Sequence, residues 1–417
     1  MDEMNEKNEK SLNRQYLLGL ITGLLISILM VVSFCIARYV ATNRIINRML
    51  ATNSEVPATG TTFDDKEFDD KVSEINKYID LWFLNDTNES TLVDGAYKGI
   101  VSALDDPYSV YYTPDEYKKV IEASNGTYKG IGVSVKTDSA TGEVVAVKVY
   151  DDSPAEEAGM EQDDVILSIN GTKVTGMDIT EVVKLIRNAE SDDVELVIRR
   201  DDAEKNVTVK RTDIDANTVA SKMFDNKVGY ILLAGFEGVS TNQFAEAVNS
   251  LKEQGMEKLI IDLRDNPGGR LDVVCDILDL FVDKDKLLVY TKDKYGEGEK
   301  CYAKYDASVK DIPICVLVNG DSASAAEVFA GVMKDYKLAT IVGKRTFGKG
   351  IVQQLITLND GSALKLTVSK YYLPNDENIH EKGIEPDVEV ELPGNAASLE
   401  ANMEDTQLSK ALEILNE

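Results

Sequence analysis

The chain carries Val318-Asn-Gly-Asp-Ser-Ala-Ser-Ala-Ala-Glu-Val-Phe-Ala-Gly331 and, a little further on, Thr346-Phe-Gly-Lys-Gly350. The first stretch follows a buried strand, and Ser324 stands in the first turn of the helix that we expect next. Free backbone N–H groups and the positive end of the helix dipole favour an oxyanion there. The second stretch places Lys349 between glycines, which let the backbone approach another group closely. Together they are the parts of a serine hydrolase whose general base is lysine.

The composition nearly excludes a histidine-dependent mechanism. The 417 residues include one histidine, His380, which lies in a late segment rich in proline and glycine. A lysine can act as a base only when it is neutral, and burial in an apolar pocket lowers its pKa enough. Phe347 and Ile351 are the neighbours that we expect to supply this environment for Lys349.

Both motifs also have a plain structural interpretation. Ser324 and Glu327 fit the S-x-x-E capping box of a helix start, which needs no catalysis. Ser322 is an equally good cap and a rival nucleophile. A lysine in a glycine-rich turn is commonly solvated, and we expect this of Lys344.

The N-terminal region predicts a membrane anchor. Residues 17–37 carry no charge and are long enough to span a bilayer core. They exceed the apolar region of a signal peptide, and no convincing cleavage site follows. We therefore expect a cytoplasmic tail (1–16), an uncleaved signal anchor (17–37), a linker (38–62) and an exported remainder. Lysine and arginine are equally frequent on both flanks, so charge bias alone does not fix the orientation.

Charge and cysteine content exclude several classes. The formal net charge of −28 argues against binding to nucleic acid or anionic lipid surfaces, both of which would repel the chain. Of the four cysteines, Cys35 lies in the expected anchor, and Cys275, Cys301 and Cys315 form an odd set without a C-x-x-C motif. We expect buried free thiols. No motif in the sequence indicates that a metal or cofactor is needed.

Four segments follow the linker. Residues 63–117 have helical spacing, and 118–212 alternate short strands and turns. Residues 213–393 alternate buried strands and helices, which predicts an α/β domain with functional residues where strands give way to helices. Residues 394–417 predict a C-terminal helix that docks on the body or on a second subunit.

The second segment resembles a PDZ domain over nearly its whole length. The motifs that carry the resemblance are Gly130-Ile-Gly-Val133, Ser153-Pro-Ala-Glu-Glu-Ala-Gly-Met160 and Asp164-Val-Ile-Leu-Ser-Ile-Asn-Gly171. In such a domain the first motif presents backbone N–H groups to a peptide C-terminus, which adds as a strand beside the helix at 179–187. The residues implied for this contact are Gly130, Ile131, Gly132 and Val133. The alternative is that the two glycines merely make a turn.

Residues 63–392 resemble a carboxyl-terminal processing protease. These are membrane-anchored or exported serine peptidases with a helical segment, an inserted PDZ domain and a crotonase-like or ClpP-like α/β core. The motifs, beyond those of the opening stretch, are Asp262-Leu-Arg-Asp-Asn-Pro-Gly-Gly269, Val342-Gly-Lys-Arg-Thr-Phe-Gly-Lys-Gly-Ile-Val-Gln353, Asp360-Gly-Ser-Ala-Leu-Lys-Leu-Thr-Val368 and Ile379-His-Glu-Lys-Gly-Ile-Glu-Pro-Asp-Val388. One departure is Ala326, where the family usually has a third serine, but that position is not the nucleophile.

The resemblance assigns the roles. It implies Ser324 as nucleophile, Lys349 as base and Gln353 as the residue that orients the lysine. The implied oxyanion hole is the N–H of Ala325 with that of Gly268 or Gly269. Arg187 resembles an arginine that links the PDZ domain to the active site, although a surface arginine at a helix end fits nearly as well. The implied substrates are proteins with free, apolar C-termini, and a homodimer is possible.

Three other functions compete with this prediction. A catalytically silent PDZ scaffold would lack Ser324, Lys349 or Gln353, and all three are present. A histidine-dependent PDZ protease needs an upstream histidine and a Gly-Asn-Ser-Gly-Gly loop, which the sequence does not contain. A crotonase-like coenzyme A enzyme is disfavoured by the PDZ insertion and the expected anchor.

Overall fold

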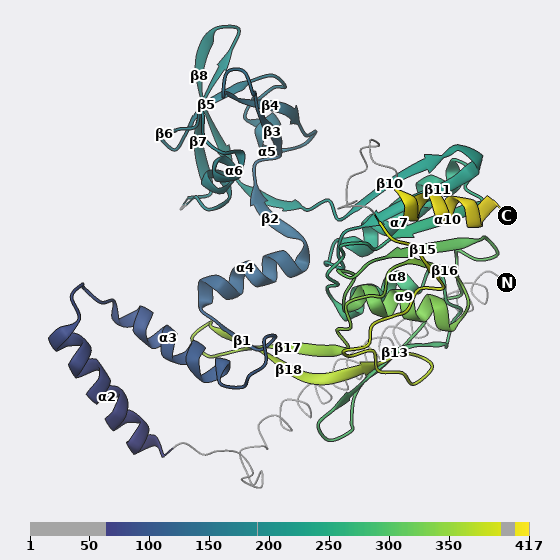
Figure 1. Cartoon of the computed structure of the whole chain (residues 1–417). Coiled ribbons are helices and arrows are strands. Elements are labelled where there is room, and N and C mark those ends of the chain that lie inside the picture. Colours follow the sequence, from purple (N-terminus) through teal and green to yellow (C-terminus); the bar gives the residue numbers. More distant parts are fainter. Residues whose placement is uncertain (1–63, 190, 393–404, 417) are drawn as a thin grey trace, which may run out of the picture. The chain divides into compact units, whose positions relative to one another are not determined.

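The computed structural model describes residues 64–189, 191–392 and 405–416 (Figure 1). The expected anchor at 17–37 and linker at 38–62 lie outside these residues. Within the described part of the chain, no helix combines the length and the apolar character needed to cross a membrane. The chain divides into two compact units, and the boundary follows Asn88.

The first unit contributes one described helix, α2 (Asp65–Trp82). It begins at Asp64, whose carboxylate accepts hydrogen bonds from the backbone N–H groups of Lys66 and Glu67 (both 3.1 Å). This is an ordinary N-cap, and it agrees with the helical spacing of the sequence. The large apolar side chain of Trp82 is 77% exposed at the end of the helix.

The second unit opens with α3 (Glu89–Ser102), β1 (Val110–Tyr112) and α4 (Pro114–Asn125). Thr113 and Glu116 form a capping box at the start of α4, and Gly126 ends the helix in the left-handed conformation. The expected boundary at residue 117 falls within α4. Strand β1 pairs with a strand more than 250 residues later in the chain, which brings the α3–β1 loop to the sheet that contains that strand.

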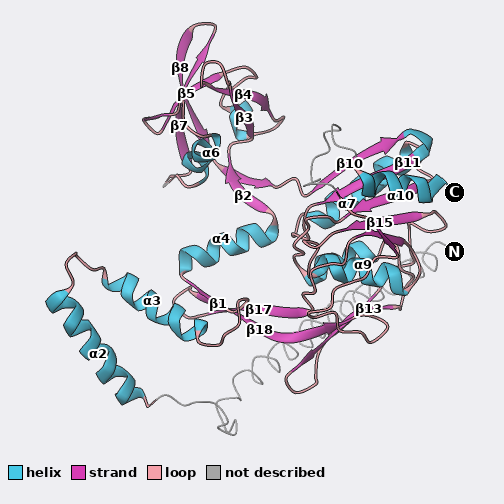
Figure 2. Cartoon of the chain, in the orientation of Figure 1, coloured by secondary structure: helices cyan, strands magenta, loops and turns pink. Residues whose placement is uncertain are grey.

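Residues 127–215 form a small β-domain that the sequence predicted well (Figure 2). The elements are β2 (Thr127–Gly130), β3 (Val133–Thr137), β4 (Val144–Val149), α5 (Pro154–Glu157), β5 (Val165–Ile169), β6 (Thr172–Lys173), α6 (Ile179–Arg187), β7 (Asp193–Arg200), β8 (Ala203–Lys210) and β9 (Thr212–Asp215). The expected Asn170-Gly171 turn joins β5 to β6, with both residues at positive φ. Strands β2 and β9 pair as a two-stranded ribbon at the two ends of this segment.

The rest of the unit is mixed α/β, as expected. Its elements are β10 (Val219–Phe224), β11 (Val228–Leu233), α7 (Ser240–Glu253), β12 (Lys258–Asp262), α8 (Leu271–Leu278), β13 (Leu287–Asp293), β14 (Lys300–Tyr302), β15 (Ile314–Val318), α9 (Ala325–Asp335), β16 (Thr340–Gly343), β17 (Ile351–Thr357), β18 (Ala363–Tyr372), β19 (Val388–Glu389) and α10 (Thr406–Asn416). Cys275, Cys301 and Cys315 are free thiols, as predicted, although Cys301 is only half-buried.

A six-stranded sheet in the order β10-β11-β12-β15-β16-β19 is the centre of this domain. Apart from the β10–β11 pair its strands are parallel. Because successive side chains point to opposite faces, Leu259 and Ile261 pack with α7, α8 and α9, whereas Ile260 packs on the other face. Both faces are therefore buried, which explains the continuous apolar runs in the sequence.

A second sheet carries β18 at its centre, paired with β17 along one edge and with β1 and β13 along the other. Helices α8 and α9 contact β13, so these helices lie between the two sheets. The nucleophile candidate stands at the start of α9 and the base candidate just before β17. This arrangement of layers places the motif that contains Ser324 next to the motif that contains Lys349.

The C-terminal helix α10 docks on the body, which was one of the two expected alternatives. Ala411 and Leu415 pack against the face of the six-stranded sheet that carries Ile260. At its start, the Asp405 carboxylate pairs with the Arg264 guanidinium at 2.9 Å. Arg264 is also paired with Asp262 at 2.6 Å, and both of these side chains are almost fully buried.

We predict that Arg264→Ala lowers the free energy of unfolding by about 3–5 kcal/mol, because it leaves the buried Asp262 charge without its cation. Lys304→Ala is the matched control. It breaks the solvent-exposed pair with Asp276 and should cost at most about 1 kcal/mol. Urea unfolding followed by far-UV circular dichroism measures both. Equal losses in the two variants would contradict the assignment of Arg264.

Candidate active site

Ser324 sits at a sharp, strained turn between β15 and α9. Its backbone has φ 55° and ψ −115°, a conformation that costs a non-glycine residue free energy and that clusters at functional sites. A strained strand-to-helix turn is also how other hydrolases expose a nucleophilic serine. The side chain is half-buried and lines a cavity. The turn thus presents this hydroxyl at the positive end of α9.

The rival nucleophile Ser322 has a structural role. It is completely buried, its hydroxyl donates to the carbonyl of Leu263 (2.7 Å), and it accepts from the N–H of Asn319 (3.0 Å). These bonds fasten the loop before α9 to the end of β12. A hydroxyl engaged in this way is not placed to attack a substrate.

The buried carboxylate of Glu327 joins the two motifs. It accepts from the backbone N–H of Ser324 (2.8 Å), which is the half of the expected capping box that the acidic residue makes. It also accepts from the N–H groups of Lys349 (2.8 Å) and Gly348 (2.7 Å) and from the hydroxyl of Thr346 (2.5 Å). One carboxylate therefore fixes the backbone of both candidate catalytic residues, with four hydrogen bonds that satisfy both of its oxygens.

The pKa of Lys349 is lowered from its ordinary value. Burial is the main cause, the positive charge of Lys365 adds to it, and the charges of Asp106 and Glu327 oppose it. Ile351 is buried beside the lysine in the same cavity, as expected. Phe347 is not part of this environment, because it is 56% exposed and its ring does not line the cavity.

The other basic candidates have different surroundings. Lys344 is ion-paired with Glu389 (3.0 Å) and with Glu391, which raises its pKa. It therefore stays protonated and cannot serve as a base at neutral pH. The backbone of His380 packs against Gly350, and its ring does not line the cavity that contains Ser324.

The Asn266–Gly269 loop lies directly against Ser324. A Cβ at Gly268 would stand 2.8 Å from Ser324 Cβ and 2.9 Å from the backbone nitrogen of Ala325, so only glycine leaves space in front of that N–H. The N–H of Gly268 donates to Asn266 Oδ1 (2.8 Å). Gly269 has φ 149° and packs against the backbone of Phe236. The space beside Ser324 is thus bordered by Ala325 and the two glycines.

Gln353 occupies a regular position on β17. Its register partner on β18 is Thr367, and its amide nitrogen donates to the Thr367 hydroxyl at 3.3 Å. Its side chain also lines the cavity that contains Ser324 and Lys349. The neighbouring Gln354 is exposed, which fits the choice of Gln353 over Gln354.

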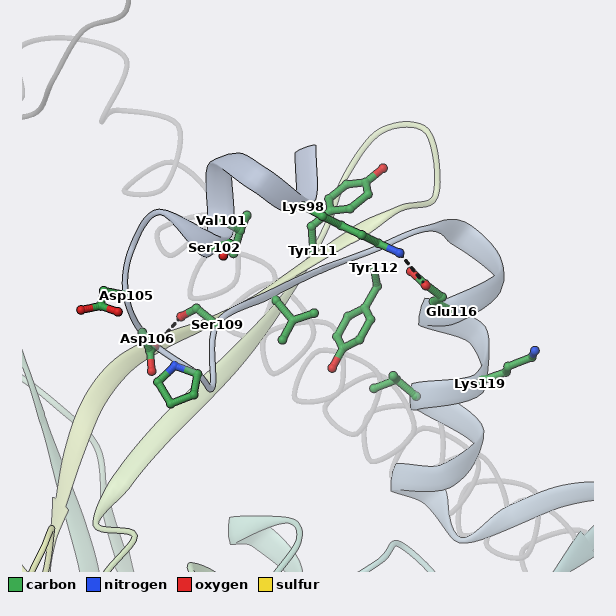
Figure 3. Close-up of a pocket in the computed structure, with 13 residues that line it drawn as sticks. Lys98, Val101, Ser102, Asp105, Asp106, Ser109, Tyr111, Tyr112, Glu116 and Lys119 are labelled. Atoms are coloured by element: carbon green, nitrogen blue, oxygen red, sulfur yellow. Dashed lines mark hydrogen bonds and ion pairs between the residues drawn. The ribbon is translucent and has the colours of Figure 1, made fainter. Parts of the chain in front are cut away.

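A cavity of about 590 Å³ gathers the predicted residues. Six of them line it although they come from three separate segments of the sequence: Gly268, Gly269, Ser324, Ala325, Lys349 and Gln353. A larger cavity, of about 790 Å³, lies between α3, β1 and α4 (Figure 3). It contains none of these six residues.

Comparisons with known proteins match this arrangement. The family model for peptidase family S41 matches residues 227–390, that for the PDZ domain residues 145–200, and that for the activating protease CtpB N-terminal domain residues 30–115. The carboxy-terminal processing protease CtpA of Bacillus subtilis is 37% identical over 333 residues, which cover 80% of this chain and 71% of that protein. The chain belongs to peptidase family S41.

Two further relatives illustrate the range of the similarity. A probable CtpA-like serine protease of Staphylococcus haemolyticus is 36% identical over 337 residues, covering 80% of this chain and 67% of that protein. Among solved structures, the photosystem II D1 C-terminal processing protease is 28% identical, with a TM-score of 0.47 over 83% of this chain and 91% of that one. The S41 and PDZ family models and the Bacillus subtilis relative show that the chain is a serine-type peptidase of the carboxyl-terminal processing family with a PDZ domain.

The PDZ domain of this S41 peptidase has an open edge beside its longer helix. Strand β3 is at the end of the sheet order β3-β4-β5-β7-β8, and α6 contacts it. The Gly130–Val133 loop leads into β3. Gly132 has φ 76°, and a Cβ there would stand 2.3 Å from that of Ser153, so this position requires glycine. Ile131 is buried in the domain core.

Arg187 ends α6 and does not line the active-site cavity. Its guanidinium lies over the ring of Tyr128, 4.0 Å from the ring centroid. Tyr128 belongs to β2, which leads into the PDZ domain from α4. The arginine is therefore an exposed residue at a helix end that contacts the connecting ribbon.

Sequence reasoning missed Tyr371, which orders the site. The hydroxyl of Tyr371 on β18 lies within hydrogen-bonding distance of the carbonyls of Ser324 (3.1 Å) and Lys349. Burial, with the charge of Glu327, raises the pKa of Tyr371, so the hydroxyl stays protonated and donates. No local pattern distinguishes it from Tyr372. Only the contacts of its hydroxyl with the Ser324 and Lys349 carbonyls distinguish it.

We predict that Glu327→Gln lowers kcat/KM at least about ten-fold and lowers Tm, because the amide group turns donors toward N–H groups that need an acceptor. Peptidase assays and thermal unfolding measure the two effects. Glu246→Gln, on the exposed face of α7, is the control and should change stability by less than about 0.5 kcal/mol. Wild-type kinetics in Glu327→Gln would show that the carboxylate does not position the site.

Proposed function

We propose that the chain is a membrane-anchored serine endopeptidase that captures protein C-termini through its PDZ domain and cleaves near them with a Ser324–Lys349 dyad. The observation that carries the proposal is the shared cavity, which is lined by all six residues expected to take part in catalysis. Their sequence separation makes this convergence a consequence of the fold rather than of local spacing.

The proton transfers follow from the surroundings of Lys349. Neutral Lys349 accepts the proton of the Ser324 hydroxyl, and the serine oxygen attacks the peptide carbonyl. The resulting Lys349 ammonium group gives its proton to the leaving amine of the substrate. The neutral Lys349 amine then takes a proton from water, and the hydroxide attacks the acyl-enzyme. The lowered pKa of Lys349 supports this role because it increases the neutral fraction. Gln353 is proposed to orient the lysine.

The oxyanion formed by the attack needs donors that are already in place. The N–H of Ala325 opens the first turn of α9 and faces the space that Gly268 leaves free. Because the N–H of Gly268 donates to Asn266, we propose Gly269 as the source of the second N–H. Two fixed backbone donors in a site with little water stabilise a tetrahedral oxyanion strongly.

Substrate capture is proposed for the groove between β3 and α6. An extended peptide would add to the open edge of β3, with its terminal carboxylate at the Gly130–Val133 loop. This arrangement selects free C-termini, because the loop N–H groups need an anionic partner. Arg187 is proposed to connect the PDZ domain to the catalytic domain through its contact with Tyr128.

The location outside the cytoplasm rests on the sequence. The uncharged stretch at 17–37 supports a single-pass anchor in the cell membrane with the catalytic part exported. A homodimer is the proposed assembly, and the exposed apolar side chains of α3, among them Leu92 and Ile100, are compatible with it. No metal or cofactor enters the proposed reaction.

We predict that Ser324→Ala and Lys349→Ala each reduce kcat/KM by at least about 10³-fold, because each removes a group without which the acyl-enzyme cannot form. The assay follows cleavage of an unfolded protein with an apolar C-terminus by the full-length chain in detergent. Lys344→Ala is the matched control and should retain wild-type activity. Full activity of Lys349→Ala would disprove the dyad, and an inactive wild type would favour a silent PDZ scaffold.

We predict that amidation of the substrate C-terminus slows cleavage about ten-fold or more at substrate concentrations below KM, because the PDZ loop loses its anionic partner. The same unfolded protein, with and without the amide, is compared in one assay. A short peptide that spans the cleaved bond but carries no PDZ-binding tail should be insensitive to amidation. Equal cleavage of both protein forms would rule out carboxylate capture.

A further inference from the structure

The loop between α3 and β1 reaches the general base. The ring of Tyr108 lies under Lys349, with the ammonium nitrogen 4.6 Å from the ring centroid. This loop precedes the nucleophile by more than 200 residues in the sequence and belongs to the helical segment before the PDZ domain. The pairing of β1 with β18 brings it to the lysine, since Val110 is the register partner of Lys365.

Asp106 is held in the same loop by a chain of hydrogen bonds. Its carboxylate accepts from the hydroxyl of Ser109 (2.6 Å) and from the N–H of Tyr108 (3.1 Å). The Ser109 oxygen in turn accepts from the N–H of Thr367 (3.1 Å), and the Thr367 hydroxyl accepts from Gln353 (3.3 Å). The loop is thereby connected to the proposed lysine-orienting glutamine.

The charged groups around Lys349 come from three elements. Asp106 faces it from the α3–β1 loop, Glu327 from α9 and Lys365 from β18. Although partial burial raises the pKa of Asp106, the hydrogen bonds from Ser109, Thr367 and Tyr108 and the charge of Lys349 lower it overall. Asp106 is therefore ionised whenever Lys349 titrates. Tyr371, also on β18, stays protonated and contributes no charge there.

We propose that Tyr108 and Asp106 are positioning residues for the general base, which hold the Lys349 ammonium group that forms when Ser324 gives up its proton. This inference rests on the proposed Ser324–Lys349 mechanism. The face of an aromatic ring attracts an ammonium ion but has little attraction for a neutral amine, and a carboxylate discriminates in the same direction. Both groups therefore favour the charged lysine, which is the species present in the transition state of acylation.

The far side of the loop shows how it is held. Asp105, Asp106, Ser109 and the neighbouring β1 residues line the cavity of about 790 Å³ (Figure 3). The loop thus borders open space on one side and the base on the other. The β1–β18 pairing and the Asp106–Ser109 and Ser109–Thr367 hydrogen bonds hold the loop beside β18.

The test is the pH dependence of kcat/KM for the full-length enzyme. In Tyr108→Leu and Asp106→Asn the midpoint of the acid limb should move to lower pH, because the ammonium form loses stabilisation while burial still favours the neutral amine. The plateau rate should fall about two- to five-fold, the factor expected from one cation–π contact. Tyr108→Phe, which keeps the ring, and Asp105→Asn, which neutralises the exposed neighbouring carboxylate, should keep the wild-type midpoint.

A second measurement does not depend on activity. In a Ser324→Ala background, limiting acetic anhydride labels Lys349 in proportion to its neutral fraction, and mass spectrometry of the peptide gives the labelling rate against pH. The same two substitutions should increase labelling below the midpoint about two- to five-fold. Labelling of Lys344 in the same samples serves as the internal reference.

The outcomes separate this inference from the proposed function. Unchanged midpoints in both assays for Tyr108→Leu and Asp106→Asn, with Lys349→Ala inactive, would overturn the inference and leave the dyad intact. A lower plateau of kcat/KM with an unchanged midpoint would mean that the loop has only a structural role, and this result would also overturn the inference. An active Lys349→Ala would overturn the dyad and with it the proposed role of the loop. If Tyr108→Leu does not fold, the nearly isosteric Asp106→Asn decides.

Discussion

The arrangement of the active site depends on one buried carboxylate. Glu327 accepts backbone hydrogen bonds from Ser324 and Lys349 at 2.8 Å each, so two segments that are distant in the sequence share one anchor. Burial of a carboxylate without hydrogen-bond partners costs free energy, and the four donors to Glu327 offset that cost. The same carboxylate that caps α9 therefore also fixes the turn that carries the base, and a local capping motif becomes a tertiary connection.

Buried polar side chains hold the neighbouring loops next to this carboxylate. Asn266 is completely buried, donates to the carbonyl of Leu233 (2.7 Å), and accepts from the N–H of Gly268 (2.8 Å). Its own carbonyl accepts from the N–H of Ala323 (2.9 Å), next to the nucleophile. Arg264, two residues earlier, ties the same loop to the C-terminal helix. The glycines beside Ser324 are thus held from both ends, which preserves the space in front of the Ala325 N–H.

Much of the site could be predicted from local sequence patterns, because a serine hydrolase with a single histidine must use another residue type as its base. Few residue types can replace histidine as a base, and a glycine-flanked lysine after a serine-headed helix is one of the few available combinations. The sequence predicts strands near 339–343, 351–358 and 363–372, and β16, β17 and β18 confirm them within one residue, since their apolar runs are bounded by turns. The environment of the lysine was predicted only in part: Ile351 lies beside it, but Phe347 points away and the ring of Tyr108 takes its place.

By itself, the sequence determined the kinds of residue available for the reaction, the order of strands and helices, and the family. The tertiary structure decided which of two serines is buried in hydrogen bonds and which lines a cavity, and which of two lysines is ion-paired and which has a pKa lowered by partial burial. It also brought Asp106 and Tyr108 to the base, through a strand pairing that spans most of the chain. The physical reason is that burial and charge, which set the reactivity of a lysine, come from neighbours in space, and a sequence states only neighbours along the chain.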